Sequence, residues 1–233
     1  MARFDALVFD MDGVLVDSEP LHMRATQEVL RPEGVDLPWE TFADYVGTTV
    51  EDTWTDLIVR FGLKGRYEDY LQLYDEAVLR VLARPLEPEP GAWDVIAAAR
   101  QRGKPLALAS SSRLRWIEAT LAGLAMRDVF AVIVSGETVR RGKPAPDIYL
   151  EAARLLRVPS QRCIAIEDAP RGVLAAKAAG MYTVALRKDY NDPAGLAPAD
   201  TILNSLEEFD LSLLDGTDGG DGPPEEGRWQ PGR

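Results

Sequence analysis

From Gly91 onward the chain alternates short apolar runs with helical segments, and this alternation constrains the fold more than any other feature. Each run is only a few residues long and is bounded by turn residues, which is typical of strands buried on both faces. Strands that alternate with helices form parallel sheets. We therefore predict an α/β fold with a doubly wound parallel sheet. The expected strands cover residues 4–10, 106–109, 129–134, 163–166, 182–186 and 201–203, and the expected helices cover 92–101, 114–122, 146–156 and 170–179.

Between the first strand and this alternating part, residues 21–83 have helical periodicity instead. Pro20 is suited to the first turn of a helix, and Thr48 with Glu51 forms a capping-box pattern before another helix. We predict about four helices and no strand in this stretch.

These changes of pattern divide the chain into two folded units and a tail. We expect a core built from residues 1–16 and 87–213, with residues 17–86 inserted as an all-helical cap. Residues 214–233 are rich in Gly, Pro and acidic residues, a composition that predicts disorder.

Charge and cysteine content exclude several classes of protein. The net charge of −12 argues against a nucleic-acid partner, because binding to phosphate backbones needs positive charge. Cys163 is the only cysteine, so no intramolecular disulfide is possible. With no leader-like segment and no long apolar span, the sequence predicts a cytoplasmic protein without a membrane partner. Nothing in it indicates more than a monomer or a weak homo-oligomer.

Two carboxylates follow the first apolar run, at Asp10 and Asp12. Residues two apart on an extended backbone point to the same side, so both side chains can reach one site. Two close carboxylates repel each other unless a cation lies between them or one takes up a proton. A polar turn would also explain this pair taken alone, but a hard divalent ion such as Mg²⁺ suits such oxygen ligands.

Further polar residues follow the later strands, and the carboxyl ends of parallel strands all lie on one edge of the sheet. Ser110 follows the second strand, Lys143 lies in the loop after the third, and Glu167 with Asp168 ends the fourth. Singly, each has an ordinary explanation: Ser110 or Asp168 as a helix cap, Lys143 as an exposed turn residue. Their joint occurrence favours a shared site.

Other catalytic patterns are absent from the sequence. His22 is the only histidine, which excludes a histidine-rich zinc site, and neither a Walker loop nor a G-x-G-x-x-G motif is present. Cys163 precedes an apolar run and is interpreted as a small core residue rather than a nucleophile.

The combined pattern resembles the haloacid dehalogenase superfamily over nearly the whole chain except the tail. Its phosphotransferases carry D-x-D, then Ser or Thr, then Lys, then an acidic pair. Here these motifs are Asp10-Met11-Asp12, Ala109-Ser110-Ser111, Gly142-Lys143-Pro144 and Ile166-Glu167-Asp168. The helical insert directly after the first motif resembles the cap of the β-phosphoglucomutase and phosphoglycolate phosphatase branch.

This resemblance implies a mechanism for phosphate esters. Asp10 is the implied nucleophile, which forms an aspartyl-phosphate, and Asp12 is the implied general acid and base. Asp10, the backbone carbonyl of Asp12 and Asp168 are expected to hold Mg²⁺, with Glu167 as a further ligand or a supporting group. The expected contacts of the phosphoryl oxygens are Ser110, Ser111, nearby backbone N–H groups and Lys143.

The resemblance also implies cap residues that face a small phosphorylated metabolite. Glu19, His22 and Thr48 are the expected contacts from the cap side, and the histidine at this place in the mutase assists the general acid. A satisfied histidine on a helix surface explains His22 equally well. One departure is Val50, because the mutase has an arginine there that clamps a second phosphate, and valine cannot do so.

We therefore expect a Mg²⁺-dependent phosphatase that hydrolyses a sugar or polyol monophosphate. A β-phosphoglucomutase-type phosphotransfer and hydrolysis of 2-phosphoglycolate remain alternatives, because they share the core residues. A phosphate-binding protein without turnover is a further alternative from a different class.

Overall fold

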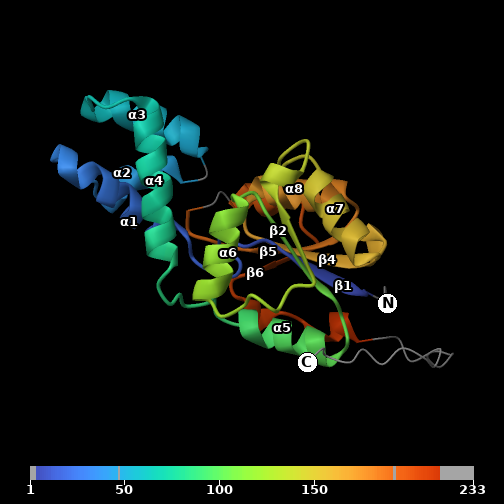
Figure 1. Ribbon diagram of the computed structural model, residues 1–233. Coiled ribbons are helices and arrows are strands. Elements are labelled where there is room, and N and C mark those ends of the chain that lie inside the picture. The colour runs from blue at the N-terminus through green and yellow to red at the C-terminus, as the bar shows by residue number, and fades with distance from the viewer. Residues whose placement is uncertain (1–3, 47, 191–192, 216–233) are drawn as a thin grey trace, which may run out of the picture.

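The computed structural model describes residues 4–46, 48–190 and 193–215. Six parallel strands form one sheet in the order β3-β2-β1-β4-β5-β6 (Figure 1), which confirms the predicted doubly wound sheet. The order runs outward in both directions from β1, so the carboxyl end of β1 lies at a topological switch point. The strands are β1 (Ala6–Phe9), β2 (Leu106–Ser110), β3 (Val132–Ser135), β4 (Cys163–Glu167), β5 (Tyr182–Leu186) and β6 (Thr201–Leu203).

Helices cover both faces of the sheet. Helices α5 (Ala92–Gln101) and α6 (Leu114–Gly123) pack on one face, and α7 (Asp147–Leu156) and α8 (Pro170–Ala178) pack on the other. The strand β1 shows how one short run serves both layers, because alternate side chains point to opposite faces. Leu7 and Phe9 join the first layer, while Ala6 and Val8 join the second.

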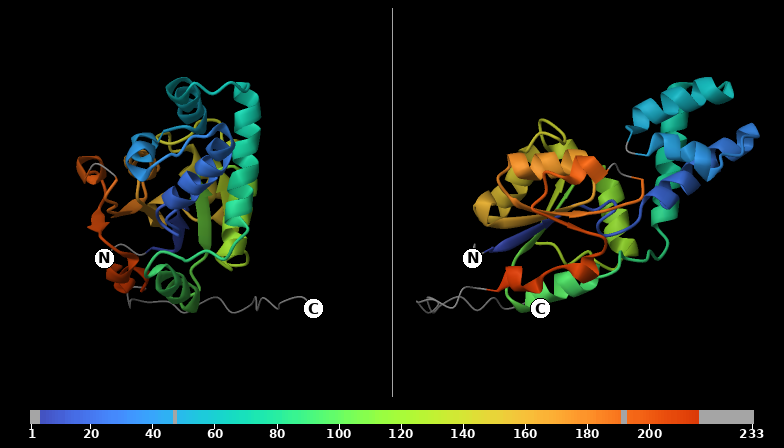
Figure 2. Two further views of the ribbon diagram at one scale, coloured as in Figure 1. Left: turned by 90° about the vertical axis from the view of Figure 1, so that its left-hand side faces the viewer. Right: turned by 180° about the vertical axis from the view of Figure 1, so that it is seen from behind.

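The insert between β1 and the core helices is entirely helical in its described residues, as predicted. It contains α1 (Glu19–Leu30), α2 (Trp39–Phe42), α3 (Val50–Phe61) and α4 (Tyr67–Leu82), with short 3₁₀ turns between them. Their buried side chains form a separate apolar cluster, which Trp116 from α6 also joins. The insert stands to one side of the sheet in Figure 1 and in the right-hand view of Figure 2, and α4 contacts α6.

Three expectations need correction or lie outside the described residues. β3 begins at Val132 rather than Val129, because the N–H of Val129 donates to the carbonyl of Met126 at 3.2 Å and closes a turn. Helix α3 is capped by Thr49, not by Thr48. The other expected bounds agree with the observed ones to within two residues. Residues 216–233 lie outside the described residues, so the expectation for the tail is not tested.

The correction at α3 has a clear local cause. The hydroxyl of Thr49 accepts the N–H of Asp52 at 3.0 Å, whereas the hydroxyl of Thr48 donates to the carbonyl of Tyr45 at 2.7 Å. Thr48 is thus engaged by the preceding turn, and the capping position moves one residue along the chain.

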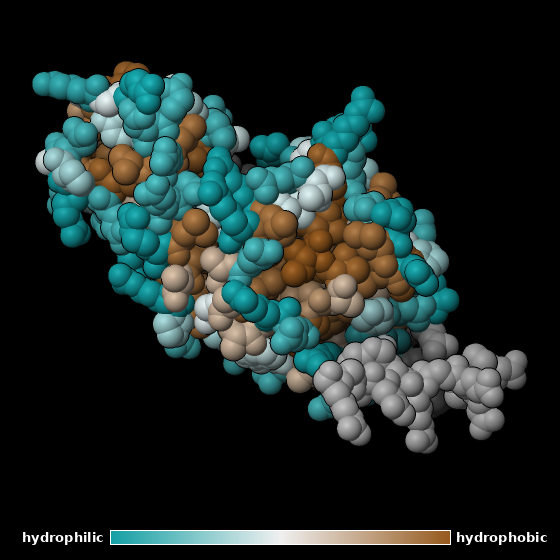
Figure 3. Space-filling model, viewed as in Figure 1, coloured by the Kyte–Doolittle hydropathy of each residue, from teal (hydrophilic) through white to brown (hydrophobic). Residues whose placement is uncertain are grey.

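None of the described helices combines the length and the apolar character needed to cross a membrane. Apolar side chains gather in the middle of the face shown in Figure 3, over the part of the core where β3 and α7 lie.

Candidate active site

Asp10 directly follows β1 at the switch point of the sheet. Its N–H donates to the carbonyl of Ile166 at 2.9 Å, which ties the residue to the end of β4. The next turn depends on Gly13, whose φ of +71° favours glycine. A Cβ at Gly13 would lie 2.2 Å from the carboxylate of Asp168, so the absence of a side chain lets this turn approach the acidic pair.

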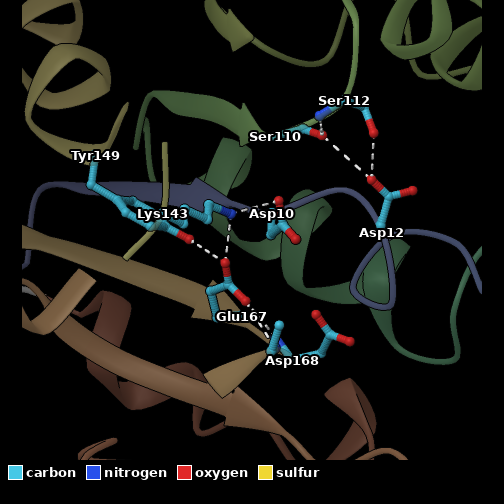
Figure 4. A network of polar contacts seen from close by, with 9 residues as sticks. Asp10, Asp12, Ser110, Ser112, Lys143, Tyr149, Glu167 and Asp168 are labelled. Atoms are coloured by element: carbon cyan, nitrogen blue, oxygen red, sulfur yellow. Dashed lines mark hydrogen bonds and ion pairs between the residues drawn. The ribbon is translucent and has the colours of Figure 1, made fainter. Parts of the chain in front are cut away.

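Lys143 joins the ends of β1 and β4. Its Nζ donates to Oδ1 of Asp10 at 2.9 Å and to Oε1 of Glu167 at 2.6 Å (Figure 4). The lysine side chain is 8% exposed, so these ion pairs are well shielded from water. Its Nζ also lies 5.1 Å from the ring centroid of Tyr149, a cation–π distance. Although burial opposes its charge, Asp10 and Glu167 raise the pKa of Lys143, so the ammonium stays charged.

Glu167 is fully buried, and protein donors engage both of its oxygens. Oε1 accepts from Lys143 and from the hydroxyl of Tyr149 at 2.9 Å, while Oε2 accepts the N–H groups of Asp168 and Ala169 at 2.9 and 3.0 Å. A Cβ at Gly172 would lie 1.7 Å from Oε1, so α8 needs a glycine there. This arrangement makes Glu167 the group that orients Lys143.

Three buried carboxylates form a group that suits a metal ion. Asp10, Glu167 and Asp168 each offer an oxygen, and these oxygens lie within 4.8 Å of one another. Burial raises the pKa of Asp10 to about 7 against the opposing effect of Lys143, and burial raises the pKa of Asp168 well above its usual range. One lysine does not balance three carboxylates, so the group needs protons or a cation. An all-oxygen set of this kind fits a hard divalent ion.

The carboxylate of Asp12 points away from this group toward the loop after β2. It accepts from the hydroxyl of Ser112 at 2.8 Å and from the hydroxyl of Ser110 at 3.4 Å (Figure 4). Ser110 is completely buried, and its hydroxyl accepts the N–H of Ser112 at 3.1 Å. Asp10 and Asp12 therefore have different environments despite their spacing.

The simple capping explanations for the strand-end residues do not hold. The N-cap residues of α6 and α8 are Arg113 and Ala169, and neither of these residues caps its helix with its own side chain. Neither Ser110 nor Asp168 is therefore the N-cap residue of the helix that follows it.

A cavity of about 560 Å³ lies between these strand ends and the insert. From the core it is lined by groups that include Asp10, Asp12, Ser111 and Lys143, but not by the fully buried Ser110. The expected cap-side residues Glu19, His22 and Thr48 all line it, and so does Val50.

Two of these cap-side residues have shifted pKa values. Burial, with contributions from Asp12 and Asp17, raises the pKa of Glu19 to about 7. Burial lowers the pKa of His22, against an opposing effect of Asp12, so the imidazole is mainly neutral at neutral pH.

Sequence reasoning did not identify four residues of this region. The sequence offers a signal for two of them, because Ser112 lies in the serine loop and Tyr149 lies on the helix that follows Lys143. Arg171 donates to the carbonyl of Lys143 at 2.8 Å and Tyr190 donates to Asp168 at 3.4 Å, and no local pattern marks either.

Comparison with known proteins places this geometry in a family. The model of the haloacid dehalogenase-like hydrolases matches residues 4–180. Hexitol phosphatase B of Escherichia coli is 34% identical over 217 residues, which cover 88% of this chain and 93% of the relative. Fructose-1-phosphate phosphatase YqaB of Escherichia coli is 35% identical over 188 residues, which cover 79% of this chain and 97% of that one.

A solved structure agrees with the sequence comparison. The crystal structure of CbbY from Rhodobacter sphaeroides in complex with xylulose-(1,5)bisphosphate matches with a TM-score of 0.77 and 33% identity. The match covers 91% of this chain and 99% of that chain. The chain is therefore an enzyme that belongs to the haloacid dehalogenase-like hydrolases.

Proposed function

We propose that the protein is a Mg²⁺-dependent phosphatase that hydrolyses a sugar or polyol monophosphate through an aspartyl-phosphate. The observation that carries this proposal is that the two carboxylates after the carboxyl end of β1 have different environments. Asp10 lies in the buried group with Lys143, while Asp12 faces the hydroxyl of Ser112 beside the cavity. We also expect the enzyme to act in the cytoplasm, where its single cysteine would stay reduced.

The two carboxylates suit the two halves of such a reaction. In the first, an oxygen of Asp10 attacks phosphorus, the bond to the ester oxygen breaks, and Asp12 gives that oxygen a proton. In the second, Asp12 takes a proton from a water molecule while the oxygen of that water attacks phosphorus. The bond between phosphorus and the oxygen of Asp10 breaks, which frees phosphate and restores Asp10. Lys143 and the serine loop stabilise negative charge on the phosphoryl oxygens.

The buried acids also support the proposed metal. Mg²⁺ would supply positive charge opposite the phosphoryl oxygens. Asp10 and Asp168, with the backbone carbonyl of Asp12, are the proposed ligands. Because four protein groups donate hydrogen bonds to the two oxygens of Glu167, we assign this residue to orienting Lys143.

The cavity favours a substrate whose leaving group is uncharged and rich in hydroxyls. Val50 offers no clamp for a second phosphate, and Glu19 and Glu51 contribute acidic groups to the wall. Arg113 also lines the cavity, but it lies 3.3 Å from Asp75 and 3.8 Å from Glu51. The names of hexitol phosphatase B and fructose-1-phosphate phosphatase agree with this substrate class. In this proposal residues 17–86 act as a cap that closes the cavity and excludes water.

The test measures phosphate release from a panel of hexitol and sugar phosphates, 2-phosphoglycolate and nucleotides, with and without Mg²⁺. We expect release from a hexitol or sugar monophosphate, and loss of turnover in Asp10→Asn with the fold retained. Asp69→Asn is the control, because Asp69 pairs with Arg66 on the exposed side of α4. Near-normal activity of Asp10→Asn would remove the mechanism.

A second assay separates hydrolysis from phosphotransfer. The enzyme is incubated with β-glucose 1-phosphate, Mg²⁺ and a bisphosphate primer. Free phosphate is the expected product, whereas glucose 6-phosphate would identify a mutase.

A further inference from the structure

The only histidine of the chain lies at the junction of the insert and the core. His22 is in the first turn of α1, and its ring lies beside those of Tyr74 on α4 and Trp116 on α6, with centroid distances of 6.2 and 5.8 Å. Its Nδ1 lies 2.8 Å from the hydroxyl of Tyr74. All three residues line the cavity that also contains Asp12.

The chemistry of this pair decides the direction of the hydrogen bond. A neutral imidazole has one N–H and one acceptor nitrogen, so the partner of one nitrogen determines where the proton lies. Burial raises the pKa of Tyr74, so its hydroxyl keeps its proton, and burial keeps His22 neutral. A phenol is a good donor and a neutral imidazole nitrogen is a good acceptor, whereas a phenol oxygen is a weak acceptor. The hydroxyl of Tyr74 therefore donates to Nδ1.

We propose that Tyr74 is a positioning residue that, by donating to Nδ1 of His22, keeps the imidazole proton on Nε2 and presents that N–H to the cavity. The Nε2–H then donates a hydrogen bond to an oxygen of the bound phosphate ester near Asp12. This role rests on the proposed phosphatase function, but the position of the proton is a property of the protein alone. Tyr74 acts only through His22.

The single histidine permits an unambiguous test by nuclear magnetic resonance. Long-range ¹H–¹⁵N spectra of uniformly ¹⁵N-labelled protein, at about pH 8 where the imidazole is neutral, report both ring nitrogens of His22. We expect the downfield shift of an unprotonated nitrogen at Nδ1 and the upfield shift of a protonated one at Nε2. If the unsubstituted protein carried the proton on Nδ1, this measurement alone would overturn the proposal.

Tyr74→Phe removes the hydroxyl and keeps the ring. In this variant we expect the two nitrogen shifts of His22 to move toward each other, because both tautomers become populated. The matched control is Tyr70→Phe, one turn away on α4, whose hydroxyl contacts Gly65 and Glu33 and does not line the cavity. Unchanged shifts in Tyr74→Phe, or equal changes in both variants, would contradict the proposal.

The catalytic consequence is measured on the same two variants. For Tyr74→Phe we expect kcat/KM to fall by about tenfold, the effect of losing one well-oriented hydrogen bond, with most of the loss in kcat. Tyr70→Phe should keep both parameters. If Tyr74→Phe changed the tautomer but left kcat/KM at the control value, Tyr74 would have no positioning role.

The two measurements separate this inference from the proposed function. Absence of phosphate release from every ester, with the expected proton on Nε2, would remove the phosphatase and leave the tautomer intact. Normal phosphate release with a proton on Nδ1 would remove only the role of Tyr74.

Discussion

At the scale of single residues, the site concentrates negative charge in a place with little water. Asp10, Glu167 and Asp168 are all buried, and Lys143 forms ion pairs with the first two of them. Such a group is ready for a divalent ion, and it also makes the metal-free protein less stable than its packing alone would allow.

Asp10→Asn should therefore stabilise the metal-free protein at high pH. The pKa of Asp10 is raised from 3.8 to about 7, so folding retains a proton that the unfolded chain releases in this range. The stability of the metal-free protein then falls as pH rises through this window and stays low above it. At about pH 8 in EDTA we expect Asp10→Asn to unfold with a free energy higher by about 1–3 kcal/mol, measured by urea denaturation.

Two controls accompany this measurement. At low pH Asp10 is protonated in both the folded and the unfolded state, so the difference in stability between the two proteins should vanish. Added Mg²⁺ should raise the melting temperature of the unsubstituted protein more than that of Asp10→Asn. A variant less stable than the unsubstituted protein in EDTA at about pH 8 would show that pairing with Lys143 outweighs burial.

At the scale of elements, α4 and α6 connect the insert to the core. Asp75 on α4 is buried and accepts from Nε1 of Trp116 at 2.9 Å, and its carboxylate lies 2.6 Å from Arg115 on α6. Trp54 on α3 is buried in the same apolar cluster, but its Nε1 has no partner among the described residues. The two tryptophans are alike in burial and differ in hydrogen bonding.

This contrast predicts that replacing tryptophan by phenylalanine lowers the free energy of unfolding by different amounts at the two positions. Trp116→Phe should lower the free energy of unfolding by about 1–2 kcal/mol more than Trp54→Phe, because it removes a donor from the buried Asp75. Trp54→Phe removes an N–H that is already unsatisfied. Urea denaturation followed by far-ultraviolet circular dichroism gives both values. Equal costs would show that packing area alone decides the effect.

At the scale of the whole molecule, the cavity exists only where the insert meets the strand ends. Both parts contribute to its charge, since Lys143 comes from the core while Glu19 and Glu51 come from the insert. The chain as a whole carries a net charge of −12. We therefore expect the insert to select ligands by charge as well as by shape.

Val50→Arg tests this selection. Val50 begins α3 and lines the cavity, so an arginine there adds a group that can bind a second phosphate. We expect the ratio of kcat/KM for a sugar bisphosphate to that for the matching monophosphate to rise about tenfold. Val50→Gln is the control, because it adds length and hydrogen bonding without charge. An equal rise in both variants would mean that charge does not govern the choice of substrate.

The sequence by itself determined the layered core, the helical insert and the residues that meet at the strand ends. These follow from local patterns, because apolar runs and helical periodicity are read within a few residues. The parallel arrangement then brings Asp10, Lys143 and Glu167 to one edge. The capping position at Thr49 and the start of β3 differ from the sequence expectation, because turn hydrogen bonds compete with capping and strand pairing.

Only the tertiary structure decided what each polar group contacts. Asp12 faces Ser112 across 100 positions of sequence, and His22 meets Tyr74 across 52. Such pairings depend on how helices and loops pack over the sheet, and no local pattern encodes the relative position of two distant side chains. The physical reason is that the hydrophobic pattern specifies which faces are buried, while the hydrogen-bond partners at the site depend on the final geometry of packing.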